Sequence, residues 1–551
     1  MENKISFIPI GGTGDVTRNM YLYESETEIL VVDCGLGFAD ETALGVDLLL
    51  PDISYLLQTK KKIVGMILTH GHEDHIGAMP FLIPQLPSFP IFATPLTAAF
   101  ANAKLVEFRS PARVKTVNFD GGDITLGGFK ISFIRVTHSI PDAANLFIRT
   151  SVGNFYHGSD FKFDLTPFDK KPTDFTKMAK VSSEGVLCLM SDSLGAESEG
   201  HTPSEQALEK SIEAEMRNCE GKFILTTYSS NISRLNQAVI AAQRVKRKVC
   251  FVGRSLIRAK DVAEGLGYMS FPKNFVITVD QVKNFKDRDL CLIVAGSQGQ
   301  ENSSMTRVAN NEHHNVSLSP KDVVVFSADP IPGNEISINS VIDAIARTGA
   351  KVVYSEINDN LHVSGHGSSQ DILLMMAITN PKRAVPIGGT YRKMVAYREL
   401  AKLHGLQEQN IHLIENGQEL VFTSEKATLG RKIPLKTVYV DEVSGEEVEQ
   451  FVLRDRQKIA QEGVVIVMVE IDTQTGQIVE SPNIIARGFS TEEARNLNKN
   501  LSQELKRNFQ ARKGTVKDWI RFRKLTGEIS ENYIYKNFKK HPLVLPVVVE
   551  V

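Results

Sequence analysis

The stretch LTHGHEDHIGAM, residues 68–79, constrains the fold of this chain more than any other feature. From His70 to His75 it holds three histidines, one glutamate and one aspartate in six positions. The apolar run KIVGMIL precedes it and indicates a buried strand. Polar side chains just past a strand are typical of α/β sheets, which carry their chemistry at the carboxyl ends of strands. The stretch therefore predicts an α/β protein with a site at such an edge.

The spacing of these side chains suits metal binding. His70 and His72 lie two apart in a predicted extended turn, so both can face one ion. Asp74 and His75 stand at the start of a predicted helix and can turn to a second ion. Imidazole and carboxylate groups bind Zn²⁺ or Mn²⁺, and two-metal hydrolytic sites hold their ions roughly 3.5–4 Å apart. A purely structural role is the alternative, but four ligand-type residues at this spacing favour metals.

Other polar residues also end apolar strands. His138 closes ISFIRVTH, and Asp160 closes NFYHGSD. Either one alone is compatible with an ordinary strand end, but their order after the histidine cluster favours a ligand role. Asp33, at the end of ILVVDCG, is predicted to orient the cluster by hydrogen bonding, as metal-bound histidines usually require. Glu73 is expected to point away from both ions or to support a ligand.

Length and composition predict a multidomain cytoplasmic protein. Single cores rarely exceed roughly 250–300 residues, and this chain has 551. Its net charge of −2 means that a nucleic acid would have to bind in a local groove. There is no signal-like start and no apolar run near the ~20 residues that span a bilayer, so we expect no membrane association. The five cysteines lack CxxC spacing and are expected to be buried free thiols.

The pattern of predicted strands and helices changes along the chain. Residues 1–165 alternate short strands with turns, whereas a unit of roughly 150 residues from about 204 alternates helices with buried strands. The second pattern is typical of a doubly wound parallel sheet. A last unit, 455–551, has two apolar strands around long polar helices.

Together the motifs resemble the metallo-β-lactamase fold, and specifically the ribonuclease J family with its inserted β-CASP domain. The resemblance extends from residue 5 to the terminal VLPVVVEV, and it rests on these segments: THGHEDHIGA, HSIPD, GSDFKFD, LMSDSLGAESEGHTPSE, TTYSSNISRLNQ, AGSQGQ, FSADPIPGNE, HVSGHGSSQ and PNIIARGF. It implies an αββα sandwich, an inserted doubly wound parallel domain and a small C-terminal α/β domain. The implied limits are 1–204 and 366–430 for the two parts of the core, 205–365 for the β-CASP domain, 431–454 for a linker and 455–551 for the C-terminal domain.

The resemblance also implies an activity and a cofactor. Members hydrolyse RNA from 5′-monophosphate ends in the 5′→3′ direction and also cut internally, in messenger turnover and ribosomal RNA maturation. One or two Zn²⁺ ions are implied, with Mn²⁺ or Mg²⁺ as alternatives, and water activated by the metals attacks the phosphodiester.

Carried over by motif, the implied site divides into ligands, catalytic residues and phosphate contacts. His70, His72 and His138 match ligands of one metal, Asp74 and His75 match ligands of the other, and Asp160 matches the bridging carboxylate. His366 and Asp74 are the implied catalytic residues. Ser230, Asn231, Ser364 and His366 match contacts to substrate phosphate, a task that suits small donors because it demands no particular base.

One ligand of the family pattern is missing. The motif P-x-H-G-E-x-R reads PIGGTYR at 386–392, so Gly388 stands in place of the last metal-binding histidine and Thr390 in place of the glutamate. Ser233 likewise replaces a histidine in the inserted domain. This erosion is similar to that of the second, weaker paralogue that Firmicutes-type bacteria often carry.

Two interpretations of the erosion remain open: a slow nuclease, or a largely non-catalytic structural and regulatory partner of an active paralogue. RNA is the implied substrate in the first. A homo-oligomer (dimer or tetramer) and a hetero-oligomer with the paralogue, formed through 455–551, are the implied assemblies.

Two further observations do not bear on the metal site directly. Residues 501–524 hold eight basic and two acidic residues and include Trp519, which fits either a docked polar helix or a surface that contacts RNA or a subunit. The bare fold also serves thioesters, lactams and glyoxalase substrates, and it is the inserted segment that favours nucleic acid.

Overall fold

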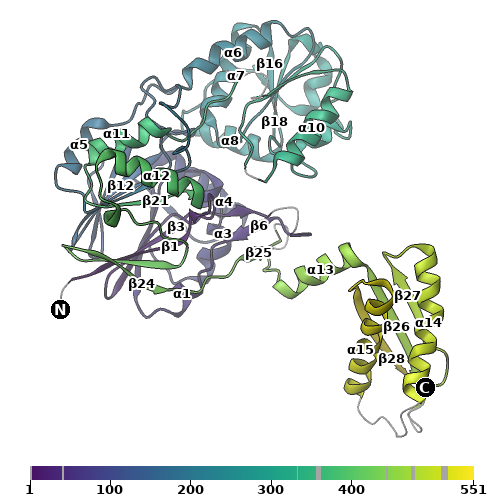
Figure 1. The fold of residues 1–551 in the computed structure, drawn as a ribbon. Coiled ribbons are helices and arrows are strands. Elements are labelled where there is room, and N and C mark those ends of the chain that lie inside the picture. Colours follow the sequence, from purple (N-terminus) through teal and green to yellow (C-terminus); the bar gives the residue numbers. More distant parts are fainter. Residues whose placement is uncertain are drawn as a thin grey trace. The chain divides into compact units, whose positions relative to one another are not determined.

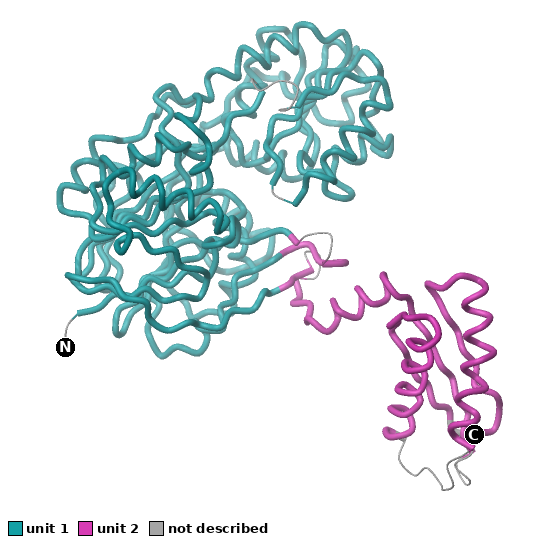
Figure 2. Tube along the Cα trace, in the orientation of Figure 1, with its two compact units in different colours: residues 1–38, 49–438 teal, residues 39–48, 439–551 magenta. Residues whose placement is uncertain are grey.

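A computed structural model describes residues 3–39, 43–331, 333–354, 361–441, 445–472, 478–510 and 519–551. The chain forms two compact units, 1–38 with 49–438 and 39–48 with 439–551 (Figure 2). The first contains two stacked sheets and the inserted sheet, and the second is a small α/β domain (Figure 1). The predicted fold class, an αββα sandwich with an inserted parallel domain and a C-terminal α/β domain, is confirmed.

Two mixed sheets form the sandwich. The first has the order β24-β23-β1-β3-β4-β7-β8-β9 and the second β10-β11-β12-β13-β14-β21. The strands of the first are Ala427–Lys432, Gln418–Phe422, Ile5–Gly11, Met20–Glu24, Glu28–Val32, Lys62–Leu68, Ile91–Ala93 and Val114–Thr116; those of the second are Ile124–Leu126, Phe129–Arg135, Ala144–Thr150, Gly153–Gly158, Cys188–Asp192 and Ala384–Ile387.

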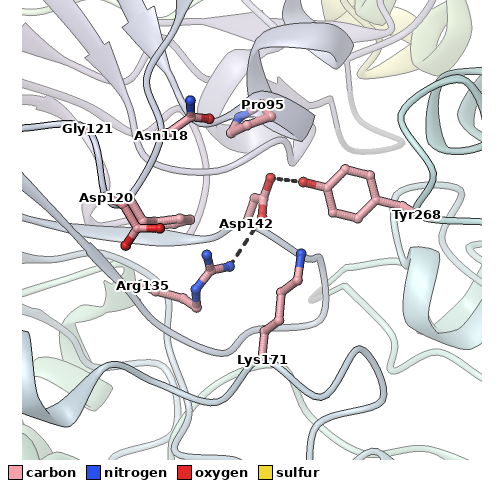
Figure 3. A pocket seen from close by; sticks show the side chains of 9 residues that line it. Pro95, Asn118, Asp120, Gly121, Arg135, Asp142, Lys171 and Tyr268 are labelled. Carbon is pink, nitrogen blue, oxygen red and sulfur yellow. Dashed lines mark hydrogen bonds and ion pairs between the residues drawn. The ribbon is translucent and has the colours of Figure 1, made fainter.

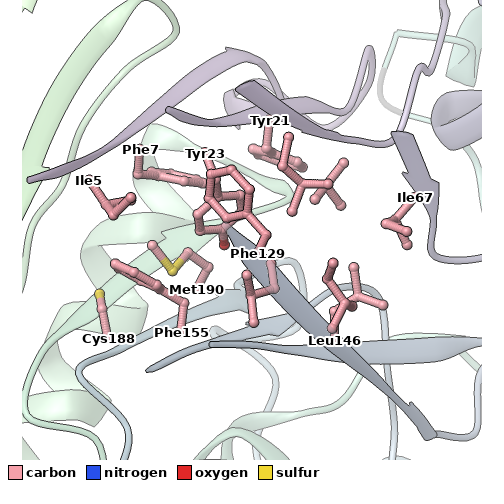
Figure 4. Close-up of a cluster of buried hydrophobic side chains, with 14 of the residues drawn as sticks. Ile5, Phe7, Tyr21, Tyr23, Ile67, Phe129, Leu146, Phe155, Cys188 and Met190 are labelled. Carbon is pink, nitrogen blue, oxygen red and sulfur yellow. The ribbon is translucent and has the colours of Figure 1, made fainter. Parts of the chain in front are cut away.

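The core of the sandwich lies between these sheets. Buried aromatic and aliphatic side chains of both sheets interlock there, Phe7 and Tyr23 from the first with Phe129, Leu146 and Phe155 from the second (Figure 4). Helix α4 (Pro95–Glu107) packs on β8 and β9 of the first sheet. Helices α5 (Phe175–Ser182), α11 (Ser369–Thr379) and α12 (Tyr391–His404) form a second core on the outer face of the other sheet. This packing holds the ends of the strands in place, and the candidate site lies at these ends.

The inserted sheet is parallel throughout, in the order β17-β16-β18-β15-β19-β20. Its strands are Val276–Ile277, Lys248–Val252, Leu290–Val294, Phe223–Thr226, Val323–Phe326 and Lys351–Val353. Both faces are apolar, as expected for a parallel sheet between helices. Helices α6 (Gln206–Arg217), α7 (Ile232–Arg244) and α8 (Arg254–Gly265) contribute to one core, and α9 (Ser304–Ala309) and α10 (Glu335–Arg347) to the other.

The second unit is built on a three-stranded sheet. β26 (Val464–Ile471) pairs antiparallel with β27 (Asn483–Arg487) and parallel with β28 (Leu543–Glu550). Alternate β26 residues face a core made with α14 (Thr491–Gln510) and α15 (Trp519–Phe538). Helix α13 (Gln450–Glu462) precedes the sheet. Residues 511–518 and the Trp519 side chain lie outside what is described, so the prediction for 501–524 stays open.

The structure also bears on the cysteines and on membrane-spanning helices. All five cysteines are free and buried, as predicted from their apolar surroundings. Among the described residues, no helix combines the length and the apolar character needed to cross a membrane.

Candidate metal centre

The predicted ligands converge at the carboxyl ends of β7, β11 and β13. His70 and His72 follow β7 in an extended turn, His138 follows β11, and Asp160 follows β13. One donor atom from each of these four residues lies within 4.8 Å of the others. We refer to His70, His72, His138 and Asp160 as the first group.

The distances in the first group fit a tetrahedral metal ion. The Nε2 atoms of His70 and His138 each lie 3.1 Å from Nδ1 of His72. Oδ2 of Asp160 lies 3.7 Å from His70 Nε2 and 3.8 Å from His138 Nε2. Zinc–nitrogen bonds of about 2.0–2.1 Å place neighbouring tetrahedral donors roughly 3.3 Å apart. The first group could therefore hold one ion with little rearrangement.

Hydrogen bonds on the far side of the rings turn lone pairs toward the centre. His138 Nδ1 donates to the carbonyl of Gly365 at 2.6 Å, which leaves its Nε2 as the inward atom. His70 Nδ1 lies 3.1 Å from Thr69 Oγ1, which itself donates to Asp33. Burial lowers the pKa of His70 and of His138, and neighbouring histidines lower both further. These rings are neutral at pH 7, the form that binds a metal.

A second group consists of Asp74, His75 and Asp160, whose donor atoms also lie within 4.8 Å. Asp74 and His75 belong to the short helix α2 (Glu73–Ile76). His75 Nε2 lies 3.4 Å from Asp74 Oδ2 and 3.3 Å from Asp160 Oδ2. Asp33, buried at the end of β4, accepts a 2.7 Å hydrogen bond from His75 Nδ1. Burial alone would lower the pKa of His75, but the carboxylates of Asp160 and Asp74 raise it well above its usual value.

Glu73 is not part of either group. Its carboxylate pairs with Lys104 on the surface, one of the two outcomes expected from the sequence. Asn19 does reach the second group, which the sequence did not indicate: its Nδ2 lies 3.1 Å from His75 Nε2 and 3.3 Å from Asp74 Oδ2.

Gly388 lies beside the second group. It follows β21, its backbone has φ +66°, and its N–H donates to Gly12 at 2.7 Å. A Cβ added there would lie 3.7 Å from Asp160 Oδ1 and 3.4 Å from Asp192 Oδ1. A side chain at position 388 would thus start next to the shared carboxylate and next to Asp192, which forms a third group of possible metal donors with Asp160 and His366. Glycine itself supplies no side-chain donor.

His366 lies next to both metal groups and is held by Asp192, for which the sequence pattern predicted no role. Its Nδ1 donates to Asp192 Oδ2 at 2.7 Å, and its Nε2 lies 4.0 Å from Asp160 Oδ2. Burial alone would lower the pKa of His366, but the charges of Asp192 and Asp160 raise it to about 9. Asp192 ends β14, so its position at a strand end was the available signal.

The predicted phosphate contacts come from two segments. Asn231 is the N-cap of α7, and its side chain accepts a hydrogen bond from the N–H of Arg234 at 3.0 Å. Ser230 precedes it and is partly exposed. Ser364 precedes His366 in the loop before α11, and its Oγ accepts from the His366 N–H at 3.2 Å. Ser233, where a histidine was expected, is buried in the first turn of α7.

A separate cavity of about 440 Å³ lies at Asp142, four residues beyond His138. Asp142 accepts hydrogen bonds from Tyr268 of the inserted segment and from Arg135 (Figure 3). Lys171 lies over the Tyr268 ring. Arg135 and Asp142 form an ion pair in this cavity, whose lining contains none of the residues of the two metal groups.

Models of known protein families match four stretches of the chain. Four family models match: the metallo-beta-lactamase superfamily at residues 13–139, the ribonuclease J beta-CASP domain at 220–345, the Zn-dependent metallo-hydrolase RNA specificity domain at 350–413 and the ribonuclease J C-terminal domain at 451–551.

Similar proteins cover nearly the whole length. Ribonuclease J2 of Bacillus subtilis is 34% identical over 99% of both chains. Ribonuclease J 1 of Streptococcus pyogenes is 37% identical over 88% of this chain and 87% of its own. A solved structure of a protein of unknown function from Enterococcus faecalis, 16% identical, covers 76% of this chain and all of its own with a TM-score of 0.55, which supports the fold alone.

Proposed function

Because the chain belongs to the ribonuclease J family, we propose that it hydrolyses RNA, from 5′-monophosphate ends in the 5′→3′ direction and at internal sites. The observation that carries this proposal is the convergence of His70, His72, His138 and Asp160 beside His366. Messenger turnover and ribosomal RNA maturation are the processes it would serve.

We propose the ligand sets given by the two groups. His70, His72, His138 and Asp160 would hold one divalent ion, and Asp74, His75 and Asp160 a second one, with Zn²⁺ as the first choice because imidazole nitrogens dominate the first set. Bound ions would polarise the phosphate and activate water. Asp33 keeps His75 Nδ1 protonated through its hydrogen bond, so that Nε2 faces the second ion.

The remaining residues bind and orient the substrate. Because Asp192 occupies Nδ1 of His366, the Nε2 side is free to donate to the scissile phosphate. Ser364, Ser230 and Asn231 would bind phosphate oxygens. Asp74, whose partly exposed carboxylate lies beside His75 in the second group, is the other proposed catalytic residue.

We propose that turnover is low. With Gly388 in place of an imidazole, the second group has three protein donors and would bind its ion weakly. A fall of 1.4 kcal/mol in transition-state stabilisation costs a factor of ten in rate, and a catalytic metal contributes several kcal/mol.

The alternative function is that of a structural and regulatory partner of an active paralogue. The same gap at Gly388 supports it, as does the 34% identity to a protein named ribonuclease J2. In this proposal the chain forms homo-oligomers and a hetero-oligomer through 455–551. The domain limits predicted from the sequence, 1–204, 205–365, 366–430, 431–454 and 455–551, remain part of the proposal.

One experiment separates the two functions. The decay of 5′-monophosphorylated RNA is followed with the protein alone, with an intact ribonuclease J and with both, and complexes are measured by size-exclusion chromatography. Decay by the protein alone that disappears in His366→Ala supports the nuclease. Stimulation of the paralogue within a stable complex supports the partner. No decay and no complex would remove both.

A further inference from the structure

Three fully buried charged residues connect the metal groups to the segments that carry the predicted phosphate contacts. Glu205 lies between Lys162 and Arg234, and none of the three side chains is more than 3% exposed. Lys162 Nζ is 3.0 Å from Glu205 Oε1, and Arg234 Nη2 is 2.9 Å from Glu205 Oε2. We call these residues the buried triad.

Each member of the triad comes from a different part of the first unit. Lys162 follows Asp160 by two residues, and its N–H donates to Thr137, the neighbour of His138, at 2.9 Å. Glu205 precedes α6, where the inserted segment begins. Arg234 belongs to the first turn of α7, capped by Asn231. The triad therefore touches the metal-binding strand ends and the α7 turn at once.

Both cations of the triad also hold the loop that leads to His366. Lys162 Nζ donates to the carbonyl of Ser364 at 3.1 Å, and Arg234 Nη1 donates to the carbonyl of Leu361 at 3.2 Å. The same loop is held further along, where the Gly365 carbonyl accepts from His138 and the His366 carbonyl accepts from Thr202. Position 365 must stay a glycine, because a Cβ there would lie 2.7 Å from the His138 ring.

The charges of the triad are arranged to stay together. Burial alone would raise the pKa of Glu205, but Lys162 and Arg234 lower it to about 2. Buried charge is costly unless it is paired and hydrogen-bonded. A simple two-residue ion pair would suffice to link two domains. The second cation is explained if it serves the loop, because each cation also donates to a backbone carbonyl of that loop.

We propose that the buried triad positions the phosphate site, with Glu205 as the residue that sets the distance between the Ser230–Asn231 turn and the Ser364–His366 loop. The proposal rests on the phosphate-binding role proposed above for these residues. Lys162, Glu205 and Arg234 are positioning residues and do not touch the reacting atoms.

The test measures binding and needs no turnover. Two RNA oligonucleotides of one sequence, with a 5′-monophosphate or a 5′-hydroxyl end and a fluorophore at the 3′ end, are titrated into the full-length protein with EDTA present. The ratio of the two Kd values reports recognition of the terminal phosphate. Glu205→Gln keeps the size of the side chain but removes the charge shared by both cations.

We expect the wild type to bind the 5′-monophosphate oligonucleotide more tightly than the 5′-hydroxyl one. In Glu205→Gln the ratio of the two Kd values should shrink about tenfold, equivalent to about 1.4 kcal/mol. Binding of the 5′-hydroxyl oligonucleotide and the number of metal equivalents should stay unchanged. Lys162→Met provides a second variant in case Glu205→Gln does not fold, because it frees the Ser364 carbonyl and leaves the pair of Glu205 with Arg234.

The matched control is Asp322→Asn. Asp322 is buried in the inserted domain and pairs with Lys222 at 3.1 Å. Its carboxylate also accepts from the N–H groups of Ser319 and Lys222, and none of these partners belongs to the loop that leads to His366. It should lower the melting temperature and leave the ratio intact. A folded Glu205→Gln with the wild-type ratio would overturn the inference alone. A wild type without any preference would overturn it together with the proposed phosphate site.

Discussion

The two metal groups share Asp160 and are built by neighbouring elements, yet they differ in completeness. The first has three imidazoles and one carboxylate at near-tetrahedral spacing. The second has one imidazole and two carboxylates, with Gly388 on its open side. The fold therefore does not depend on the full ligand set, because the Gly388 N–H donates to the Gly12 carbonyl in the absence of a side chain at this position.

The largest effect should follow from breaking the first group. His138→Ala removes one of its three imidazoles and also the hydrogen bond that holds Gly365. We expect RNA decay to fall by about 10⁴-fold, because a metal contributes several kcal/mol to transition-state stabilisation. Elemental analysis after dialysis should show the loss of the tightly held ion. The control is His314→Ala, an exposed histidine that should change neither value. Retention of the ion by His138→Ala would contradict the assignment of the first group.

A somewhat smaller loss is expected from His366→Ala, which leaves both groups intact. In the proposed function His366 would act beside the ions, and a positioned proton donor contributes roughly 10²–10⁴-fold. We expect decay to fall by about 10³-fold with unchanged metal content. Asp192→Asn should reproduce part of this loss, because it removes the charge opposite Nδ1. Unchanged decay in His366→Ala would mean that the measured activity arises elsewhere.

Repairing the second group should raise activity. Gly388→His, alone or with Thr390→Glu, introduces an imidazole whose Cβ would lie 3.7 Å from Asp160 Oδ1. The positive φ costs of the order of 1–3 kcal/mol for a residue with a side chain, but no atom blocks the Cβ. We expect a gain of about 10-fold or more in RNA decay and a second tightly held ion.

Gly388→Ala is the matched control for the repair, since it carries the same backbone strain without a ligand. It should lower the melting temperature and add neither activity nor metal. A wild type that is already fast, and that gains nothing from the histidine, would remove the argument that the second group limits catalysis.

The sequence predicted the part of this centre that depends on local spacing. His70, His72, Asp74 and His75 fall within six positions, and His138 and Asp160 end strands that any α/β fold brings to one edge. The partners that hold them were not predictable in this way. The Asp192–His366 bond joins residues 174 apart, and the contact of Lys162 with Ser364 joins residues 202 apart.

The sequence also did not predict the roles of Lys162, Glu205 and Arg234, because all three are charged residue types that usually lie on the surface. Charged side chains are seldom fully buried, so a sequence pattern assigns them to solvent unless a partner is known. All three lie in motifs that resemble the family, but their burial depends on the packing of three segments that are separated in the sequence.

The smallest expected effect is on stability, and it distinguishes the two groups in the unmodified protein. After exhaustive dialysis the wild type should keep one ion, because the first group offers four donors and the second three. An ion that binds only the folded state stabilises it by RT ln(1 + [L]/Kd), about 2.7 kcal/mol at a hundred times Kd and about 0.4 kcal/mol at a concentration equal to Kd. Titration of the metal-free protein with Mn²⁺ should therefore raise the melting temperature in two phases, a large one at low Mn²⁺ concentration and a small one at high concentration.

In His138→Ala the phase at low concentration should vanish, and in Gly388→His the phase at high concentration should move to lower Mn²⁺. Two equally tight ions in the wild type would show that another donor replaces the missing imidazole, and Asp192 is a candidate, because its carboxylate lies 3.4 Å from a Cβ at position 388 and groups with Asp160.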